Sequence, residues 1–411
     1  MKKNFLILMF SLIGMIGLGI KVYAERNPVL PPPYETPSVP NPSTVIGWPE
    51  GKMPVAPEGF MVSVFAELAS PRSLYLLESG DVVVSQAKRT PDDGGAESPN
   101  QITYFKMTGS QMESSFVLLK DLNFPFGMTV WENEFYVGEP ERVLAFPFDG
   151  EKITGPSRLV ATLPFPEPKR HWTRHLLMAN DGSKLYVSVG SVSNVGEAPD
   201  PLDPRTAAIL QMNRDGSGEK IFAGGLRNAV SMAWEPKTAR LWAAVNERDE
   251  LGDFVPPDYI THVQEDGFYG WPYAYWGKNE DPRRKGERPD LVEKSIQPDF
   301  SVGAHTAALG ITFTTGTKVP APYNEGALVA LHGSWNSSSL VGYKVLFVPF
   351  KDGEAIDGEK DFLTGFIADL SKSTVYGRPV STLVLTDGSI LVADDAGNRI
   401  WKVTPPPEKK R

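Results

Sequence analysis

The chain has 411 residues, of which 41% are hydrophobic and 22% charged, values typical of a folded globular protein. Its formal charge of −9 argues against a nucleic-acid partner, because an acidic surface repels phosphate backbones. The absence of cysteine excludes disulfides and thiolate metal sites.

Residues 1–24 have the pattern of a signal peptide. Lys2 and Lys3 form a positive n-region, residues 5–20 are apolar, and the sequence VYA, which ends at Ala24, resembles a cleavage site. An uncleaved N-terminal anchor is the alternative, although the apolar run is slightly short for a full membrane span. Both interpretations predict an exported protein, periplasmic or secreted. Removal of the leader leaves 38 basic and 50 acidic side chains, a formal charge of −12.

Residues 25–58 are dense in proline, which disfavours regular structure and predicts an extended linker. The folded body is expected at residues 59–405, followed by a charged tail at 406–411. No second compositional break divides the body, so we predict one domain.

A strand–turn–strand unit recurs six times in the body. The turn centres lie near Asp81, Asn133, Asp181, Lys237, Tyr323 and Asp387, in segments rich in Gly, Asp, Asn or Pro. Six such units predict an all-β fold, a six-bladed β-propeller. The strand within residues 59–68 remains unassigned, and we expect it to complete the last blade and so leave few exposed edges. A pair of β-sandwiches is the alternative.

Basic residues precede the first strand of five of the six units. They are Arg72, His171 with His175, Arg227 next to Asn228, His305 and Arg378; the unit that starts near Phe124 is the exception. In a propeller these positions gather at one mouth of the central channel. Converging cations repel one another in a low-dielectric channel, so a multiply anionic ligand is expected there. Arginine binds carboxylates in a two-pronged geometry.

Two further groups at this mouth are candidates for chemistry. A histidine such as His171 has a pKa suited to a general base, although a hydrogen-bonded wall residue is the simpler interpretation. The acidic loop Glu247–Asp253 is compatible with calcium or with a solvated turn. A zinc pair of His171 and His175 is disfavoured, because this segment alternates as a strand. The run 281–290 is expected to be a solvated loop.

Several motifs together resemble the sorbosone dehydrogenase family. They are GLRNAVSMAWEP, NERDELGD, GFYGWPY, HTAALGITF and HGSWN, within a resemblance that extends from about Pro49 to Pro405. That family is grouped with soluble quinoprotein glucose dehydrogenases and fungal quinoprotein pyranose dehydrogenases. The resemblance implies a six-bladed propeller that holds pyrroloquinoline quinone (PQQ) and calcium over the channel. It also implies oxidation of a sugar or a related aldehyde or alcohol, with electrons passed to an external acceptor.

The resemblance also implies roles for single residues. His171 corresponds to the catalytic base, which takes the substrate hydroxyl proton while hydride passes to the quinone. Arg227, Asn228 and Arg378 correspond to cofactor-binding residues, and Trp335 is expected to border the cofactor plane. The peptide carbonyls of Asp249 and Glu250 correspond to calcium ligands. The loops 194–204 and 277–298 are expected to shape the sugar pocket.

One position departs from the family. Members often carry a basic residue directly after GSWN, where it reaches the quinone oxygens, but this chain has Ser337, and nothing in the sequence shows that Lys344 replaces the missing cation. This departure leaves open a non-catalytic binding propeller that has lost quinone chemistry. A calcium-dependent lactonase is a further alternative, disfavoured because such a site needs carboxylates and amides rather than Arg and His.

Overall fold

The structure is a computed structural model that describes residues 24–88, 97–167, 169–197 and 202–407. The predicted signal peptide, apart from Ala24, therefore lies outside the described residues. Regular structure is almost entirely β-strand, as predicted; the described helical elements are α1 (Pro289–Lys294) and the 3-10 turns η1 (Pro282–Arg284) and η2 (Leu370–Lys372). None of the described helices is long and apolar enough to cross a membrane.

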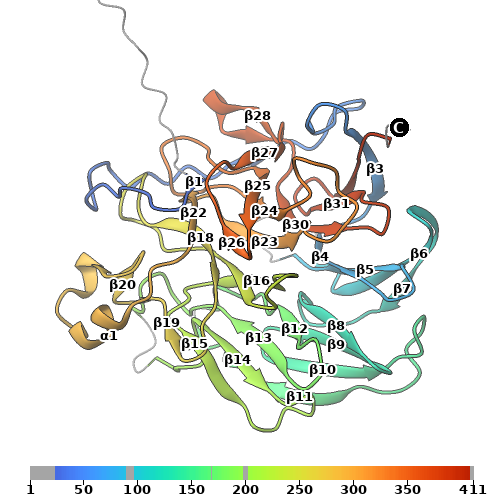
Figure 1. Cartoon of the computed structure of the whole chain (residues 1–411), viewed down its shortest axis with the longest axis horizontal. Coiled ribbons are helices and arrows are strands. Elements are labelled where there is room, and N and C mark those ends of the chain that lie inside the picture. Colours follow the sequence, from blue (N-terminus) through green and yellow to red (C-terminus); the bar gives the residue numbers. More distant parts are fainter. Residues whose placement is uncertain (1–23, 89–96, 168, 198–201, 408–411) are drawn as a thin grey trace, which may run out of the picture.

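Most strands belong to six mainly antiparallel sheets (Figure 1). The first sheet contains β4 (Pro71–Leu76), β5 (Val82–Gln86), β6 (Gln101–Thr108) and β7 (Gln111–Leu119). The second contains β8 (Met128–Trp131), β9 (Glu134–Glu139), β10 (Arg142–Pro147) and β11 (Arg158–Thr162). The third contains β12 (Leu176–Met178), β13 (Leu185–Val189), β14 (Ala208–Met212) and β15 (Lys220–Gly224), and β19 (Gly267–Phe268) pairs with β15 in parallel.

The other three sheets complete the body. The fourth sheet contains β16 (Ala229–Trp234), β17 (Leu241–Val245), β18 (Pro257–His262) and β22 (Phe300–Ala304). The fifth contains β23 (Ala308–Phe313), β24 (Gly326–Leu331), β25 (Lys344–Lys351), β26 (Glu354–Ala355) and β27 (Lys360–Leu363). The sixth contains β30 (Pro379–Val384), β31 (Ile390–Asp394), β32 (Arg399–Thr404) and β3 (Met61–Glu67). Each of the six predicted hairpins is present, because the turn residues separate the first two strands of each sheet. The strand expected from residues 59–68 is β3, and it pairs antiparallel with β32.

The hydrophobic core lies between neighbouring sheets rather than at one centre. One cluster joins Tyr104 of β6 to Phe135 of β9, and another joins Val143 of β10 to Leu185 of β13. Nearly continuous apolar runs in middle strands such as β5 and β13 are buried on both faces of their sheets, and six core clusters each join two neighbouring sheets, so every sheet packs against both of its neighbours. Fully burying one such side chain contributes about 1.5–3 kcal/mol, and Trp242 and Trp401 are fully buried in this way.

The first strands of the six sheets surround a channel. In chain order β4, β8, β12, β16, β23 and β30 contact one another, and β30 contacts β4 again. The channel has a volume of about 420 Å³ and is lined by residues of all six strands. The backbones approach closely there: a Cβ atom on Gly127 would lie 2.4 Å from the carbonyl oxygen of Arg174.

The segment 24–58, predicted as an extended linker, lies along the body. Its strand β1 (Ala24–Glu25) pairs with β22, and β2 (Thr44–Val45) pairs in parallel with β29 (Thr374–Val375), which also pairs with β28 (Ile367–Asp369). Trp48 is buried in the core cluster that contains Trp401. A small hairpin of β20 (Ala274–Tyr275) and β21 (Asn279–Glu280) lies beside η1 and α1.

We predict that Gly127→Ala destabilises the protein by roughly 1–3 kcal/mol, because the added methyl group collides with the backbone of residues 174–176. Urea unfolding of both proteins measures the loss. Gly224→Ala is the matched control, since its Cβ would meet only a Phe268 ring carbon at 3.9 Å. Equal stability of the two variants would contradict the close approach of β8 and β12.

Candidate active site

The starts of the inner strands meet at one end of the channel, which we call the mouth. Val230, Leu309 and Val380, each the second residue of its strand, pack together with Phe126, which precedes β8. We call these four buried residues the apolar layer. Because the layer joins strands from different sides of the channel, the basic residues that precede those strands lie at the same end of the molecule.

His171 is oriented at the mouth by Ser191. Its Nδ1 lies 2.7 Å from the Ser191 carbonyl oxygen and 3.0 Å from Ser191 Oγ, which itself donates to the Ser193 carbonyl. Both Ser191 oxygens therefore accept from Nδ1, which carries the proton and leaves the lone pair on Nε2. Burial and the positive charge of Arg227 hold the pKa of His171 well below its usual value. The ring is neutral near pH 7 and has a nitrogen ready to accept a proton.

Asn228 lies directly beside His171. A Cβ atom on Gly190 would fall 2.4 Å from Asn228 Oδ1 and 2.5 Å from His171 Cβ, so only glycine allows both side chains to approach this strand end. Asn228 Oδ1 is buried and has no hydrogen-bond partner among the described residues. An unsatisfied buried acceptor costs about 1–3 kcal/mol. The oxygen is suited to accept from an O–H or N–H group of a bound molecule.

Arg227 is buried and bonded to the protein itself. It donates to the carbonyl oxygens of Asn194 (3.2 Å) and Glu247 (2.6 Å) and to Asn194 Oδ1 (3.0 Å), and Asp249 Oδ2 lies 3.8 Å away. Its main-chain carbonyl accepts from Ser191 N, which links it to His171. Arg227 therefore adds positive charge beside His171 while its hydrogen bonds hold the two loops that carry Asn194 and Glu247.

Arg378 belongs to a second cationic group at the mouth. Its Nε and Nη2 donate to the carbonyl oxygens of His332 (3.0 Å) and Gly333 (2.7 Å). The Asp395 carboxylate bonds to His332 Nε2 at 2.8 Å and to Arg72 Nη1. Burial and the charge of Arg378 lower the pKa of His332 to about 4, so this imidazole is neutral at physiological pH.

Arg72 connects this group to the His171 side. Its guanidinium lies 4.9 Å from the ring centre of Trp172 and 5.5 Å from that of Phe126, so it stacks between the mouth and the apolar layer. Its Nε is buried without a partner among the described residues. His171, Asn228 and Arg227 thus lie together, and Arg72 connects them, through Trp172 and Asp395, to the group around Arg378.

The carbonyls of Asp249 and Glu250 are the predicted calcium ligands. The Asp249 carbonyl accepts from Arg283 Nη1 at 2.9 Å and from Asn194 Nδ2 at 3.2 Å, so both of its lone pairs face N–H donors. The Asp249 carboxylate bonds to His305 Nδ1 at 3.1 Å. No cluster of three or more His, Cys, Asp or Glu side chains arranged to hold a metal ion occurs in the described part of the chain. Calcium needs roughly six to eight oxygen ligands, and the Asp249 carbonyl, already bonded to two donors, does not fit the predicted role as one of them.

Trp335 and Ser337 lie on the loop between β24 and β25. Trp335 is 45% exposed, and its carbonyl accepts from Asn41 N. Ser337 is buried at the position where family members often carry a cation. Lys344 does not replace that cation, because its Nζ bonds to Asp361 Oδ1 of the outer strand β27 at 2.5 Å.

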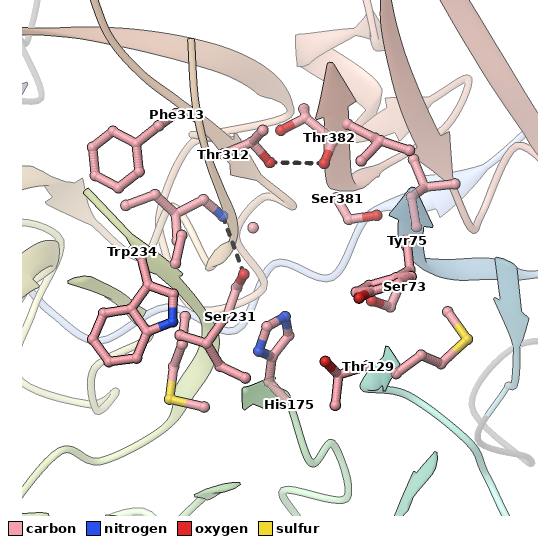
Figure 2. Close-up of a pocket in the computed structure, with 18 of the residues that line it drawn as sticks. Ser73, Tyr75, Thr129, His175, Ser231, Trp234, Thr312, Phe313, Ser381 and Thr382 are labelled. Carbon is pink, nitrogen blue, oxygen red and sulfur yellow. Dashed lines mark hydrogen bonds between the residues drawn. The ribbon is translucent and has the colours of Figure 1, made fainter. Parts of the chain in front are cut away.

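His175 lies below the mouth, and its placement among the mouth residues is wrong. It lines the channel together with the hydroxyl groups of Ser73, Thr129, Ser231 and Thr382 (Figure 2). His175 directly precedes β12, and its Cα would lie 2.7 Å from a Cβ atom on Gly127, so its backbone packs against the segment that leads into β8. Burial lowers the pKa of His175 to about 4, and its Nδ1 has no partner among the described residues.

Sequence reasoning missed the residues that orient the site. Ser191, Asp395 and Arg283 all contact predicted site residues, yet Arg283 belongs to the run expected to be a solvated loop. Their contacts are largely to main-chain atoms or cross from one sheet to another. The VADD sequence at the end of β31 was the one available signal, since two adjacent acids in an apolar strand need partners.

The fold and the mouth define a protein built to hold a polar ligand beside a neutral imidazole. The chain belongs to the glucose/sorbosone dehydrogenase family, whose family model matches residues 132–369. This confirms the resemblance read from the motifs, and the family indicates an oxidoreductase that acts on sugars.

Relatives and solved structures agree with this family. An uncharacterized protein of Borreliella burgdorferi is 31% identical over 363 residues, which cover 84% of this chain and 89% of the relative. An aldose sugar dehydrogenase of Escherichia coli is 32% identical over 146 residues, 34% of this chain and 35% of that protein. The holo PQQ domain of a pyranose dehydrogenase from Coprinopsis cinerea shares the fold, with a TM-score of 0.71 and 18% identity, over 88% of this chain and 99% of that domain.

We predict that calcium does not stabilise the purified protein, because Arg283 and Asn194 already bond to the Asp249 carbonyl. Thermal melting after chelator treatment and again with millimolar calcium should give the same midpoint. A clear rise with calcium that Arg283→Gln changes would show that a metal competes with this guanidinium. Arg288→Gln serves as the control, since Arg288 bonds to Asp290 on the exposed side of the same loop.

Proposed function

We propose that this protein is an exported, PQQ-dependent dehydrogenase that oxidises a sugar or a sugar-derived aldehyde, with His171 as its base. The observation that carries the proposal is the pair of neighbouring groups at the mouth, a neutral His171 with Nδ1 held by Ser191 and a buried Asn228 oxygen without a partner. The substrate class follows the family, and a soluble external acceptor is proposed for the electrons.

His171 is suited to take a proton from a substrate hydroxyl. Ser191 fixes the ring and its tautomer, so Nε2 is the basic atom, and burial together with the charge of Arg227 lowers the pKa and keeps the ring unprotonated. Positioned proton transfer of this kind typically contributes about 10²–10⁴-fold to the rate. Asn228 Oδ1 is placed to accept from a hydroxyl group next to the same ring and thereby to orient it.

The mouth also fits a planar polycarboxylate quinone. Arg72, with an unpartnered buried Nε, and Arg378 provide positive charge for carboxylates on one side, and on the other side Asn228 Oδ1 would accept an N–H group of the ligand rather than face a carboxylate. The apolar layer closes the site from below with aromatic and aliphatic surface. When bound, PQQ would supply the two-electron acceptor for the substrate hydride. We assign Asp249 and Glu250 a supporting role at the mouth, through Arg283 and Asn194, and the proposal does not include calcium.

The wider architecture follows from the same family. We propose that the six sheets are the blades of a six-bladed propeller, closed by β3 against β32; the contacts of β30 with β4 support this. We also propose that residues 1–24 are an export signal and that the loops near 194 and 284 border the sugar. Arg284 Nε, which donates to the Val195 carbonyl at 2.8 Å, supports the pairing of these two loops.

Reconstitution tests the proposal directly. We expect PQQ to bind the purified protein with a spectral change and to support dye reduction with one or more aldoses. His171→Gln should lose at least about 10²-fold in kcat and keep quinone binding, because the residue acts on the proton rather than on the cofactor. His262→Gln is the control, since His262 bonds to Asp299 on the outer part of its sheet.

Three outcomes would overturn the proposal in different ways. Quinone binding without any turnover across a sugar panel would favour a non-catalytic binding protein. Lactone hydrolysis in the absence of quinone would favour the lactonase alternative. Turnover of His171→Gln at the parent rate would remove His171 as the base and leave the cofactor assignment intact.

The pH dependence of turnover provides a separate prediction. Because the folded-state pKa of His171 lies below the usual value of 6.5, the neutral base persists as the pH falls through 6.5. The acid limb of the kcat/KM profile, which reports the free enzyme, should therefore lie below pH 6.5 and should move upward in Arg227→Gln, where one of the charges that lower the pKa is missing. An acid limb at or above pH 6.5 in the parent protein would show that His171 is not the titrating base.

A further inference from the structure

We infer that Trp48, in the segment predicted as a linker, is a positioning residue for Arg378, and that the functional unit begins before residue 59. The inference rests on the proposed function, in which Arg378 contacts the cofactor. Its starting observation is the 2.6 Å hydrogen bond from Trp48 Nε1 to Asp394 Oδ2, which joins residues 346 positions apart.

The segment that ends at Trp48 passes along the loops of the mouth. Tyr34 N donates to the Leu251 carbonyl, next to the Asp249–Glu250 pair. Thr36 Oγ1 accepts from Asp253 N at 2.7 Å, and Ser38 bonds to Asn336, whose Oδ1 also accepts from Glu250 N. The segment therefore touches the loop after β17 and the loop after β24 before it reaches the small sheet of β2, β29 and β28.

Two further contacts lead to the Arg378 side. Asn41 N donates to the Trp335 carbonyl at 2.6 Å, and Thr44 and Val45 pair with β29, a few residues before Arg378. Main-chain atoms of a proline-rich segment make these bonds. Because proline restricts the conformation of the segment, little chain entropy is lost when it lies against the mouth. The predicted linker thus connects three separate parts of the mouth.

Asp394 is where this segment meets the proposed cofactor residue. Its fully buried carboxylate accepts four N–H groups: Oδ2 accepts from Trp48 and, at 3.1 Å, from Trp401, and Oδ1 accepts from the main chain of Arg378 at 2.7 Å and of Gly397 at 2.8 Å. A buried carboxylate is stable only when its oxygens are satisfied. Trp48 supplies the shorter of the two indole bonds.

The consequence for Arg378 follows from its own contacts. Its main chain is held by Asp394, and its guanidinium is held by the carbonyls of residues 332 and 333. Loss of the Trp48 donor weakens the anchor of the carboxylate, because burial already raises the pKa of Asp394 to about 6. A shift of Asp394 moves the Arg378 main chain and with it the charge presented to the cofactor.

The test measures PQQ affinity by titration of the purified protein. We expect Trp48→Phe, which keeps the ring packing against Trp401 and removes the donor, to weaken quinone binding roughly tenfold. Trp234→Phe is the matched control, since it also loses an indole hydrogen bond, to the Met178 carbonyl, but lies on the channel away from Arg378. The control should bind quinone as the parent protein does.

A double-mutant cycle separates positioning from general destabilisation. In an Arg378→Ala background, Trp48→Phe should have no further effect on quinone affinity if it acts through Arg378. An equal loss in both backgrounds would overturn the inference. If Trp48→Phe does not fold, Asp394→Asn replaces it, with the same expectation in the cycle.

The result also separates this inference from the proposed function. A parent protein that fails to bind quinone refutes the proposed function, and the inference falls with it. A parent protein that binds quinone with Trp48→Phe unchanged refutes the role of Trp48 alone.

Discussion

The close approach of six inner strands around one axis is the constraint on which this structure depends. The backbones of β8 and β12 come so near that residue 127 has to be glycine, and β23 meets β30 in the same way at Gly310. Above this contact the apolar layer joins strands from different sheets, so the segments that precede them end at one mouth. The site consists of residues far apart in the sequence because the inner strands of different sheets all begin at this end of the channel.

The electrostatics of the mouth differ from the expectation of exposed, mutually repelling cations. Arg227 donates to three main-chain carbonyls and Arg378 to two, and the carboxylates of Asp249 and Asp395 lie among the cations. The protein thus neutralises part of this charge itself. Burial, together with the positive charge that remains, lowers the pKa values of His171 and His332 and keeps both imidazoles neutral; in the proposed function this suits His171 to proton transfer.

The elements that carry a local signal were predictable, and those held by main-chain contacts were not. Gly, Asp, Asn or Pro at the turns identified all six hairpins, and the apolar alternation of β16 placed Arg227 at a strand start. Proline density predicted an extended linker at residues 25–58, but composition does not reveal that Trp48 meets Asp394. The position of Arg283 likewise depends on a carbonyl of another loop, and carbonyls are the same in every sequence.

The apolar layer also determines how molecules enter and leave. Phe126, Val230, Leu309 and Val380 pack between the mouth and the channel below, so the mouth has a floor. In the proposed function, a sugar and the molecule that removes the electrons would both approach the mouth from the side opposite this floor and would therefore compete for the same space above it.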